Sequence, residues 1–404
     1  MSLPTAIAEP AAEHITAAAP ALRPVAIWLL SCCGMIFAMV VIGGVTRLTL
    51  SGLSITEWQP VTGILPPLSA AAWAAEFEKY QQIPQYRLIN HGMTFSDFQT
   101  IYWWEYVHRL WGRLIGFAYA APFVDFLARG RIPRRLTWPL IGIFALGAAQ
   151  GALGWYMVES GLADRVEVSQ YRLVAHLALA LAIYAATLWI ALSILMPDPR
   201  LAPVSSPHPS ASRPPSPACG GGSRRRSAPI SSLPRKRGRV GVGACWRRAA
   251  EAVITLVALT ILAGGFVAGL HAGLVYNTFP LMNGSLVPPD YAQLQPFIRN
   301  WFENVATVQF DHRLLAMTTA AAVLALWLAA SCAVLPRPAR LALHGLLAIA
   351  ALQFFLGVLT LLLVVPVPLA AAHQGGAVLL LTAALVLRHT LRRRQLDAAV
   401  SAAI

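Results

Sequence analysis

Eight long apolar stretches dominate the pattern of hydrophobic and polar positions along the chain. They run at residues 25–45, 106–128, 138–158, 172–196, 252–270, 310–335, 341–365 and 369–388. Each is close to the roughly 20 residues that a helix needs to cross a bilayer. The pattern therefore predicts an all-α integral membrane protein with eight transmembrane helices. Because no basic region precedes the first stretch and no small-residue cleavage site follows it, we interpret it as a span rather than a signal peptide.

Composition and charge agree with this interpretation. Hydrophobic residues make up 57% of the chain and charged residues 12%, which excludes an ordinary soluble domain. The net charge of +14 could indicate a nucleic-acid partner. Most of the 31 basic residues, however, lie in three connections and one tail, at 129–135, 200–248, 337–340 and 388–394. The positive-inside rule then places these segments and both termini in the cytoplasm, and no nucleic-acid partner is needed to explain the charge.

One composition break divides the chain into two halves. Residues 197–248 are rich in Pro, Ser, Gly and Arg, which is typical of a disordered segment, here a basic cytoplasmic linker. We expect one four-helix bundle at 25–196 and a second at 249–390. The remaining segments, 1–24 and 391–404, are expected to be cytoplasmic tails.

The two halves share short motifs in the same order. The matching pairs are Gly43-Gly44 with Gly264-Gly265, His108-Arg109 with His312-Arg313, and Ala175-His176 with Ala372-His373. Because each half has an even number of spans, both halves enter the membrane in one orientation. The sequence therefore predicts a parallel repeat, with two four-helix bundles side by side.

Four of the ten histidines stand at the outer ends of the even-numbered spans: His108, His176, His312 and His373. One histidine in a span is usually a hydrogen-bonded packing residue, but two repeat-related sets at matched depth favour a function. Facing imidazoles in a helix bundle are a common way to ligate b-type haem, and no C-x-x-C-H motif for covalent attachment is present. Three nearby arginines could bind haem propionates or simply anchor the spans at the interface: Arg109, Arg113 and Arg313.

The two halves differ at one position near these histidines. Glu105 stands three residues before His108, whereas Gln309 stands three residues before His312. A carboxyl group one turn from an iron ligand can exchange protons with a substrate at the edge of the porphyrin. Glu105 could also be a solvated interfacial acid. The asymmetry favours chemistry in the first half and a permanent, electron-relaying haem in the second.

The long segment at about 46–104 is expected to be an outside loop, and its aromatic residues could cover an apolar substrate entering from the lipid. We expect a structural role for His271 in the loop after the fifth span, and no function is predicted for His91. None of the five cysteines lies in an outside loop, so no periplasmic disulfide is expected.

Several motifs together resemble the haem A synthase family, most closely the branch found in alphaproteobacteria and mitochondria. They are the stretches Gly43 to Arg47, Glu105 to Arg113, Asn277 to Met282, Phe310 to Arg313 and Ala372 to Gln374. The resemblance covers about residues 25 to 390 apart from the linker. It implies a protein of the bacterial inner membrane that oxidises the C8 methyl group of haem O to a formyl group, through a hydroxymethyl intermediate, to supply haem A for cytochrome oxidase.

The resemblance also implies roles for individual residues. His108 and His176 would flank the substrate haem, His312 and His373 would ligate haem b, and Glu105 would be the essential acid. The implied partners are haem O synthase as the source of haem O, cytochrome oxidase assembly factors, and an electron donor or acceptor that the sequence does not identify. Some bacterial members have a cysteine pair in the first outside loop, and this chain lacks it.

Two other classes of protein share some of these features. A dihaem b-type membrane cytochrome that only transfers electrons would use the same four histidines but would not need Glu105. A transporter is suggested by the parallel repeat, but no pair of interrupted helices supports it.

Overall fold

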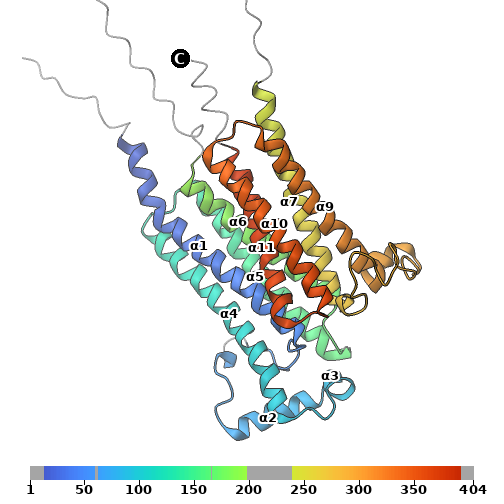
Figure 1. Cartoon of the computed structure of the whole chain (residues 1–404). Helices are drawn as coiled ribbons and strands as arrows, with labels where there is room; N and C mark the ends of the chain where they lie inside the picture. Colours follow the sequence, from blue (N-terminus) through green and yellow to red (C-terminus); the bar gives the residue numbers. More distant parts are fainter. Residues whose placement is uncertain (1–12, 60–61, 165, 198–238, 393–404) are drawn as a thin grey trace, which may run out of the picture.

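The computed structural model describes residues 13–59, 62–164, 166–197 and 239–392, and their regular structure is helical apart from one isolated bridge. The eight longest helices run through the body of the molecule (Figure 1). They are α1 (Glu13–Leu48), α4 (Phe95–Ala128), α5 (Arg134–Asp164), α6 (Gln170–Leu195), α7 (Arg239–Gly269), α9 (Val305–Ser331), α10 (Arg337–Leu362) and α11 (Val367–Thr390). Shorter helices follow α1 and α7 at one end.

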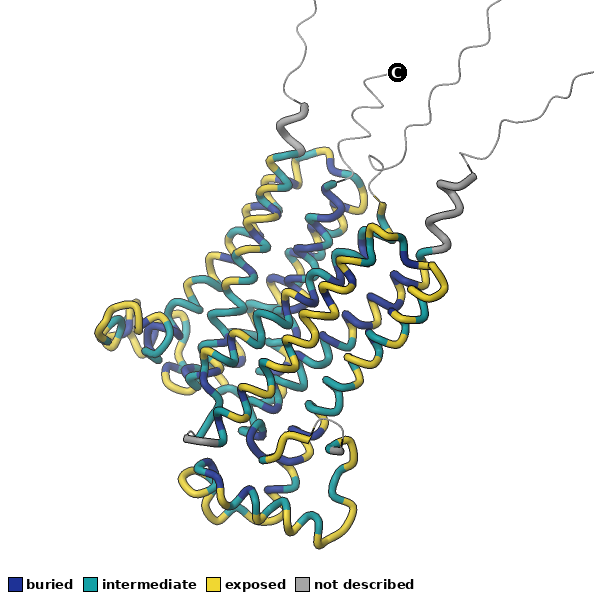
Figure 2. Tube along the Cα trace, turned by 180° about the vertical axis from the view of Figure 1, so that it is seen from behind, coloured by how far each residue is buried: buried dark blue, intermediate teal, exposed yellow. Residues whose placement is uncertain are grey.

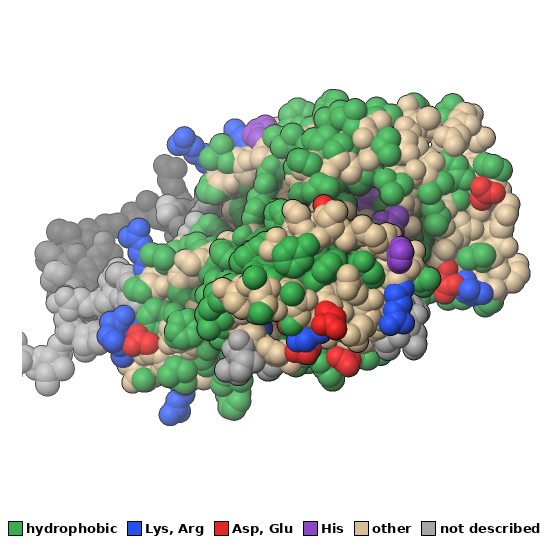
Figure 3. Space-filling view, turned by 90° about the horizontal axis from the view of Figure 1, so that it is seen from below, with side chains coloured by type: hydrophobic (Ala, Val, Ile, Leu, Met, Phe, Trp, Pro, Cys, Tyr) green, Lys and Arg blue, Asp and Glu red, His purple; other side chains and the backbone are tan. Residues whose placement is uncertain are grey.

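Seven of the long helices, all except α4, are long and apolar enough to cross a membrane. The chain is therefore an integral membrane protein. Large apolar side chains point outward from the bundle, among them Phe117, Trp138 and Phe355, each more than 70% exposed. Figure 2 shows the exposed positions on the outer sides of the helices, and the face in Figure 3 is mostly hydrophobic or uncharged. Such side chains are stable in contact with lipid.

The helices of the two halves pack in matching ways. In the first half α1 packs against α4 and α6, and α5 packs against α6. In the second half α7 packs against α9 and α11, and α10 packs against α9 and α11. The halves meet where α1 contacts α11 and where α6 contacts α7. The first helix of each half is thus in contact with the last helix of both halves.

The segment between α1 and α4 contains short helices, whereas the sequence predicts a long loop at 46–104. It contains α2 (Ala70–Gln81) and α3 (Pro84–Leu88), and α4 begins at Phe95 rather than near residue 106. The first turn of α4 has a capping box, because Thr94 Oγ1 accepts from the Asp97 N–H and the Asp97 carboxylate accepts from the Thr94 N–H, each at 3.2 Å. The early turns of α4 are stabilised by a buried cluster of Leu53, Tyr80, Ile83, Phe98, Ile101, Tyr102 and Tyr106.

Two helices also begin earlier than the hydrophobic pattern indicates. The α1 helix starts at Glu13, inside the expected tail at 1–24, and α7 starts at Arg239, inside the expected linker at 197–248. In both helices the extra turns come before the apolar stretch. Helical hydrogen bonding does not require apolar residues, and long Arg side chains in such turns can reach water. Residues 198–238 and 393–404 lie outside the described residues, so the predictions of a disordered linker and a C-terminal tail are not tested there.

Candidate functional site

Each of the four predicted histidines packs its imidazole against a glycine on a neighbouring helix. A Cβ atom at these glycines would lie 2.8 to 3.1 Å from the imidazole Cε1, which is tighter than most side-chain contacts and, at Gly357, closer than real Cβ atoms come. The pairs are Gly43 with His108, Gly154 with His176, Gly264 with His312, and Gly357 with His373. The glycines come from α1, α5, α7 and α10 and the histidines from α4, α6, α9 and α11. Glycine at these positions lets each backbone approach the ring closely.

Within each half the two histidines are in electrostatic range of each other, His108 of His176 and His312 of His373. All four are only partly buried although they lie well inside long helices. The structure thus pairs two imidazoles in each half.

The imidazole Nδ1 atoms differ between the halves. His312 Nδ1 lies 3.2 Å from the Thr260 carbonyl oxygen and must donate to it, since a carbonyl only accepts. His373 Nδ1 lies 3.1 Å from Gln353 Nε2, and this amide also donates to the His373 carbonyl at 2.9 Å. Among the described residues, by contrast, the Nδ1 atoms of His108 and His176 are buried without a hydrogen-bond partner. The rings of the second half are therefore held in orientation more firmly.

The second glycine of each Gly-Gly motif serves the contact between the halves. A Cβ atom on Gly44 would collide with Gln374 of α11, and one on Gly265 would lie 3.0 Å from Val174 of α6. Gln374 also donates to the Val40 carbonyl of α1 at 3.0 Å. Each motif thus accommodates the histidine of its own half and the last helix of the other half.

Glu105 is buried, with 3% of its surface exposed, and both of its carboxylate oxygens accept hydrogen bonds. Oε2 accepts from the Ser54 hydroxyl at 2.8 Å and from the Ile55 N–H at 2.7 Å. Oε1 accepts from Arg109 Nη2 at 2.6 Å and Nε at 3.0 Å. This burial does not fit the alternative that Glu105 is a solvated acid at the membrane interface. The carboxylate ties the segment after α1 to α4, one turn from His108.

The corresponding position in the second half has an amide. Gln309 is 2% exposed, and its Nε2 donates to the Tyr276 carbonyl at 3.2 Å. It therefore joins the segment after α7 to α9 without a titratable group. The asymmetry seen in the sequence corresponds to two buried side chains at equivalent places in the fold.

The three predicted propionate contacts donate to backbone carbonyls of the segments that follow α1 and α7. Arg109 donates to Ile55 and Glu57 at 2.7 and 3.0 Å, and Arg113 donates to Gln59 at 2.9 Å. In the second half Arg313 donates to Tyr276 and Thr278 at 2.6 and 2.8 Å. Arg109 and Arg313 thus hold equivalent turns in the two halves. Contact with propionates stays a prediction, and the structure adds a role in anchoring these turns.

A further polar cluster joins the two halves at the end where α1 and α7 finish. Glu167 Oε2 accepts from Arg47 Nη2 at 2.9 Å, and His271 Nε2 lies 2.7 Å from the same oxygen. Arg47 Nη2 also donates to the Gly269 carbonyl at 3.0 Å. The hydrogen bonds from His271 and Arg47 hold the pKa of the Glu167 carboxyl down, from 4.5 to about 2. We call these three residues the inter-half cluster.

Replacing Glu167 with glutamine is expected to destabilise the folded protein by about 1 kcal/mol at neutral pH, because charge-assisted hydrogen bonds between the halves are lost. A carboxyl whose folded pKa is depressed contributes stability above its unfolded pKa and loses it as the pH falls. The stability difference between the parent and the variant should therefore be largest above pH 4.5 and vanish as the pH approaches 2. The measurement is the thermal unfolding midpoint of both proteins against pH.

Glu76→Gln is the matched control for this variant. Glu76 is also an acid with a basic partner, Lys79 at 2.9 Å, but the pair lies three residues apart within α2 of one half. Its replacement should change stability little, since ion pairs near the surface contribute little. Equal effects of the two variants would contradict a bridging role for Glu167.

Sequence reasoning missed several residues of this site. Gly154 and Gly357 each stand four residues after a glutamine, in Gln150-x-x-Leu-Gly and Gln353-x-x-Leu-Gly, and each of these glutamines donates to a histidine carbonyl. Extending the repeat comparison to α5 and α10 would have found this motif. Thr260 and Ser54 act through contacts with another helix or segment, and no local pattern marks them.

Comparison with known proteins finds relatives over most of the chain. A family model described as cytochrome oxidase assembly protein matches residues 26–219 and 223–385. The chain is 50% identical over 372 residues to "Heme A synthase" of Nitrosospira multiformis, covering 92% of this chain and 94% of that protein. It is 48% identical over 366 residues to "Heme A synthase" of Rhodospirillum centenum, covering 90% and 87%. It is 44% identical over 385 residues to "Heme A synthase COX15" of Arabidopsis thaliana, covering 94% and 77%.

The fold and site define an integral membrane protein with paired, glycine-cradled histidines in each of two similarly packed halves. The chain belongs to the cytochrome oxidase assembly protein family that includes these haem A synthases. The resemblance drawn from the motifs is therefore confirmed.

Proposed function

We propose that this chain is a haem A synthase, an oxidoreductase that converts the C8 methyl group of haem O to a formyl group. Relatives named "Heme A synthase" in bacteria, a plant and mouse match most of its length. The observation in the fold that carries the proposal is the pair of equivalent histidine sites of which only one has a buried carboxylate. Two similar sites with one acid suit an enzyme with one resident haem and one substrate haem.

The second half is proposed to hold haem b through His312 and His373. Its residues fit this group: Gly264 and Gly357 bring the neighbouring backbones against the rings, and the Thr260 carbonyl takes the His312 Nδ1 proton. That leaves the lone pair of His312 Nε2 available for iron, and a fixed ring orientation strengthens such a bond. His373 would offer Nε2 in the same way with the Gln353 amide turned so that its Oε1, which has no hydrogen-bond partner among the described residues, accepts from His373 Nδ1. When bound, haem b supplies a redox-active iron for electron transfer during the oxidation.

The first half is proposed to bind haem O between His108 and His176. A substrate haem must enter and leave, so its ligands need less restraint than those of a resident haem. The buried Nδ1 atoms of both rings have no partner among the described residues, which agrees with this difference. Gly43 and Gly154 keep room beside the rings as in the second half.

Glu105 is proposed as the catalytic acid and base of the first half. Its carboxylate is excluded from water and held one turn from His108 by Ser54, Ile55 and Arg109. A group in such a position can take or return protons as a substrate methyl group is oxidised. Gln309 cannot do this in the second half, which assigns the chemistry to the first.

We also propose eight transmembrane helices arranged as two parallel four-helix bundles. The α4 helix would be the eighth span, since it is 34 residues long and its charged site residues Glu105, Arg109 and Arg113 lower its hydropathy. The matched packing of the two halves supports the repeat.

Basic residues at the inner ends support cytoplasmic termini in a bacterial inner membrane, with the histidines toward the periplasmic side.

Three kinds of partner follow from this function. Haem O would come from haem O synthase, and haem A would pass toward cytochrome oxidase through assembly factors. An electron donor or acceptor is also required, because oxidising a methyl group releases electrons.

The test is expression of the chain in cells that make haem O but lack a haem A synthase. Haems extracted from the membranes are separated by chromatography and identified by mass. Haem A should form in these cells and not in cells with an empty vector. A protein that binds haem b and leaves haem O unchanged under air would instead be a dihaem b-type cytochrome that only transfers electrons.

A further inference from the structure

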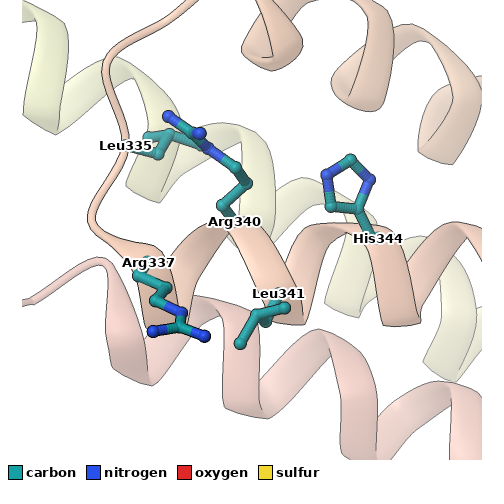
Figure 4. Close-up of a pocket in the computed structure, with 5 residues that line it drawn as sticks. All are labelled: Leu335, Arg337, Arg340, Leu341 and His344. Atoms are coloured by element: carbon teal, nitrogen blue, oxygen red, sulfur yellow. The ribbon is translucent and has the colours of Figure 1, made fainter.

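A cavity of about 530 Å³ lies where α9 is followed by α10, at the opposite end of the molecule from α2 and α3 (Figures 1 and 4). It is lined by Leu335, Arg337, Arg340, Leu341 and His344. The histidine site does not extend to it, since its four histidines lie toward the other ends of their helices or deeper in them. The family's proposed activity gives these lining residues no role.

The two arginines of this cavity differ from two paired arginines near the same end. Arg129 is paired with Asp125 at 2.7 Å and Arg388 with Glu251 at 2.6 Å. Within the described part of the chain, the structure shows no hydrogen bond or ion pair for the guanidinium of Arg337 or Arg340. Two cations without acidic partners therefore line one cavity, which favours an anionic ligand.

His344 adds a directed donor to this cavity. The Trp327 indole N–H of α9 donates to His344 Nδ1 at 2.9 Å, so a neutral His344 ring carries its proton on Nε2. Figure 4 shows Arg340 and His344 on one side of α10, with Leu335 beside Arg340, and Arg337 and Leu341 on the other side. An anion between Arg340 and His344 would meet a guanidinium and an imidazole N–H one helical turn apart.

The location of the cavity indicates which kind of anion it binds. It lies at the end of the bundle where α1 and α7 begin and α11 ends, which the positive-inside rule puts at the cytoplasmic leaflet. Anionic phospholipids are concentrated in that leaflet, and basic pockets between helices on that side bind their headgroups. Leu341 is 62% exposed beside the arginines and offers an apolar surface for an acyl chain. The volume is within the range of small-ligand sites.

We propose that this cavity binds the phosphate group of an anionic phospholipid from the cytoplasmic leaflet. Arg340 and His344 Nε2 hydrogen-bond the phosphate, Arg337 adds positive charge at the rim, and the exposed Leu341 contacts the lipid chain. The proposal is independent of the haem chemistry, because none of these residues contacts the histidine site. A bound lipid would fix the connection between α9 and α10.

The test is lipid binding to the purified full chain, measured by native mass spectrometry with phosphatidylglycerol, phosphatidylcholine and inorganic phosphate as separate probes. The parent should bind phosphatidylglycerol in preference to phosphatidylcholine. In Arg337→Gln/Arg340→Gln the affinity for phosphatidylglycerol should fall at least about tenfold, because two charge-assisted contacts are lost. Arg340→Gln alone should lose less affinity for phosphatidylglycerol, and this single variant replaces the double variant in the test if the double variant folds poorly.

The matched control is Arg134→Gln/Arg135→Gln in the first turn of α5, which removes the same charge from the equivalent helix of the other half. It should bind phosphatidylglycerol within about twofold of the parent. Equal losses in the two double variants would show only general attraction of charges and would overturn the proposal. Phosphatidylcholine binding as tight as that of phosphatidylglycerol would also overturn it. Tight binding of inorganic phosphate that displaces the lipid would reassign the cavity to a free anion.

Discussion

Replacing Glu105 with glutamine is expected to reduce haem A formation at least about 100-fold while the protein still folds and retains haem b. Positioned general acids and bases contribute roughly this much or more to a reaction rate. Glutamine has nearly the same shape and keeps one oxygen that can accept from Arg109, but it cannot take up or release a proton. The measurement is the ratio of haem A to haem O extracted from cells that make haem O.

Two further variants separate chemistry from structure at this position. Glu57→Gln removes a carboxylate from the same outer segment, where Glu57 is exposed and paired with Lys79 at 2.9 Å, and it should leave haem A formation near the parent level. Ser54→Ala removes one donor to Glu105 but leaves the carboxylate, so activity should be reduced and not abolished. Near-normal haem A formation by Glu105→Gln would rule out Glu105 as the proton-transfer group.

Replacing Gly357 with valine is expected to lower the amount of haem b in the purified protein at least about tenfold. Even a Cβ atom there would lie 2.8 Å from His373 Cε1, so the valine must displace the imidazole. Losing the support of a metal ligand typically costs 10-fold to 100-fold in metal affinity. The measurement is the absorbance of the reduced haem per protein chain after purification.

The control for this variant is Gly345→Val in the same helix, where a new Cβ atom would have no neighbour within 4 Å. It should retain haem b, since a β-branched residue there changes helix propensity and little else. In the first half, Gly154→Val should lower haem A formation without loss of haem b. Gly151→Val, where a new Cβ atom would have no neighbour within 4 Å, should leave haem A formation near the parent level. Equal haem content in Gly357→Val and Gly345→Val would contradict the role of the glycine cradle.

The hydrophobic pattern found the helical body of the protein because a membrane span has one strong requirement, a long apolar stretch. It was less accurate at helix ends. The α4 helix starts at Phe95, where the polar turn at Thr94 and Asp97 is a capping signal and not a hydrophobic one. The start of α1 at Glu13 has no apolar signal at all, so hydropathy could not reveal it.

The histidines of the candidate site could be found from the sequence because residues of one kind recur at related positions in the two halves. Their surroundings could not be found in the same way. The contact of Gly357 with His373 joins two helices, and the inter-half cluster joins segments more than 100 residues apart. The arginines illustrate the same limit, because the turns whose carbonyls accept from Arg109 and Arg313 are positioned only by the fold.

The most direct measurement is the haem composition of membranes from cells that make haem O and no haem A, with and without this chain. The two histidine sites with one buried acid predict that haem A forms only when the chain is present, and that the purified protein retains haem b. A correctly folded chain that binds haem b at both sites and yields no haem A under air would contradict the account.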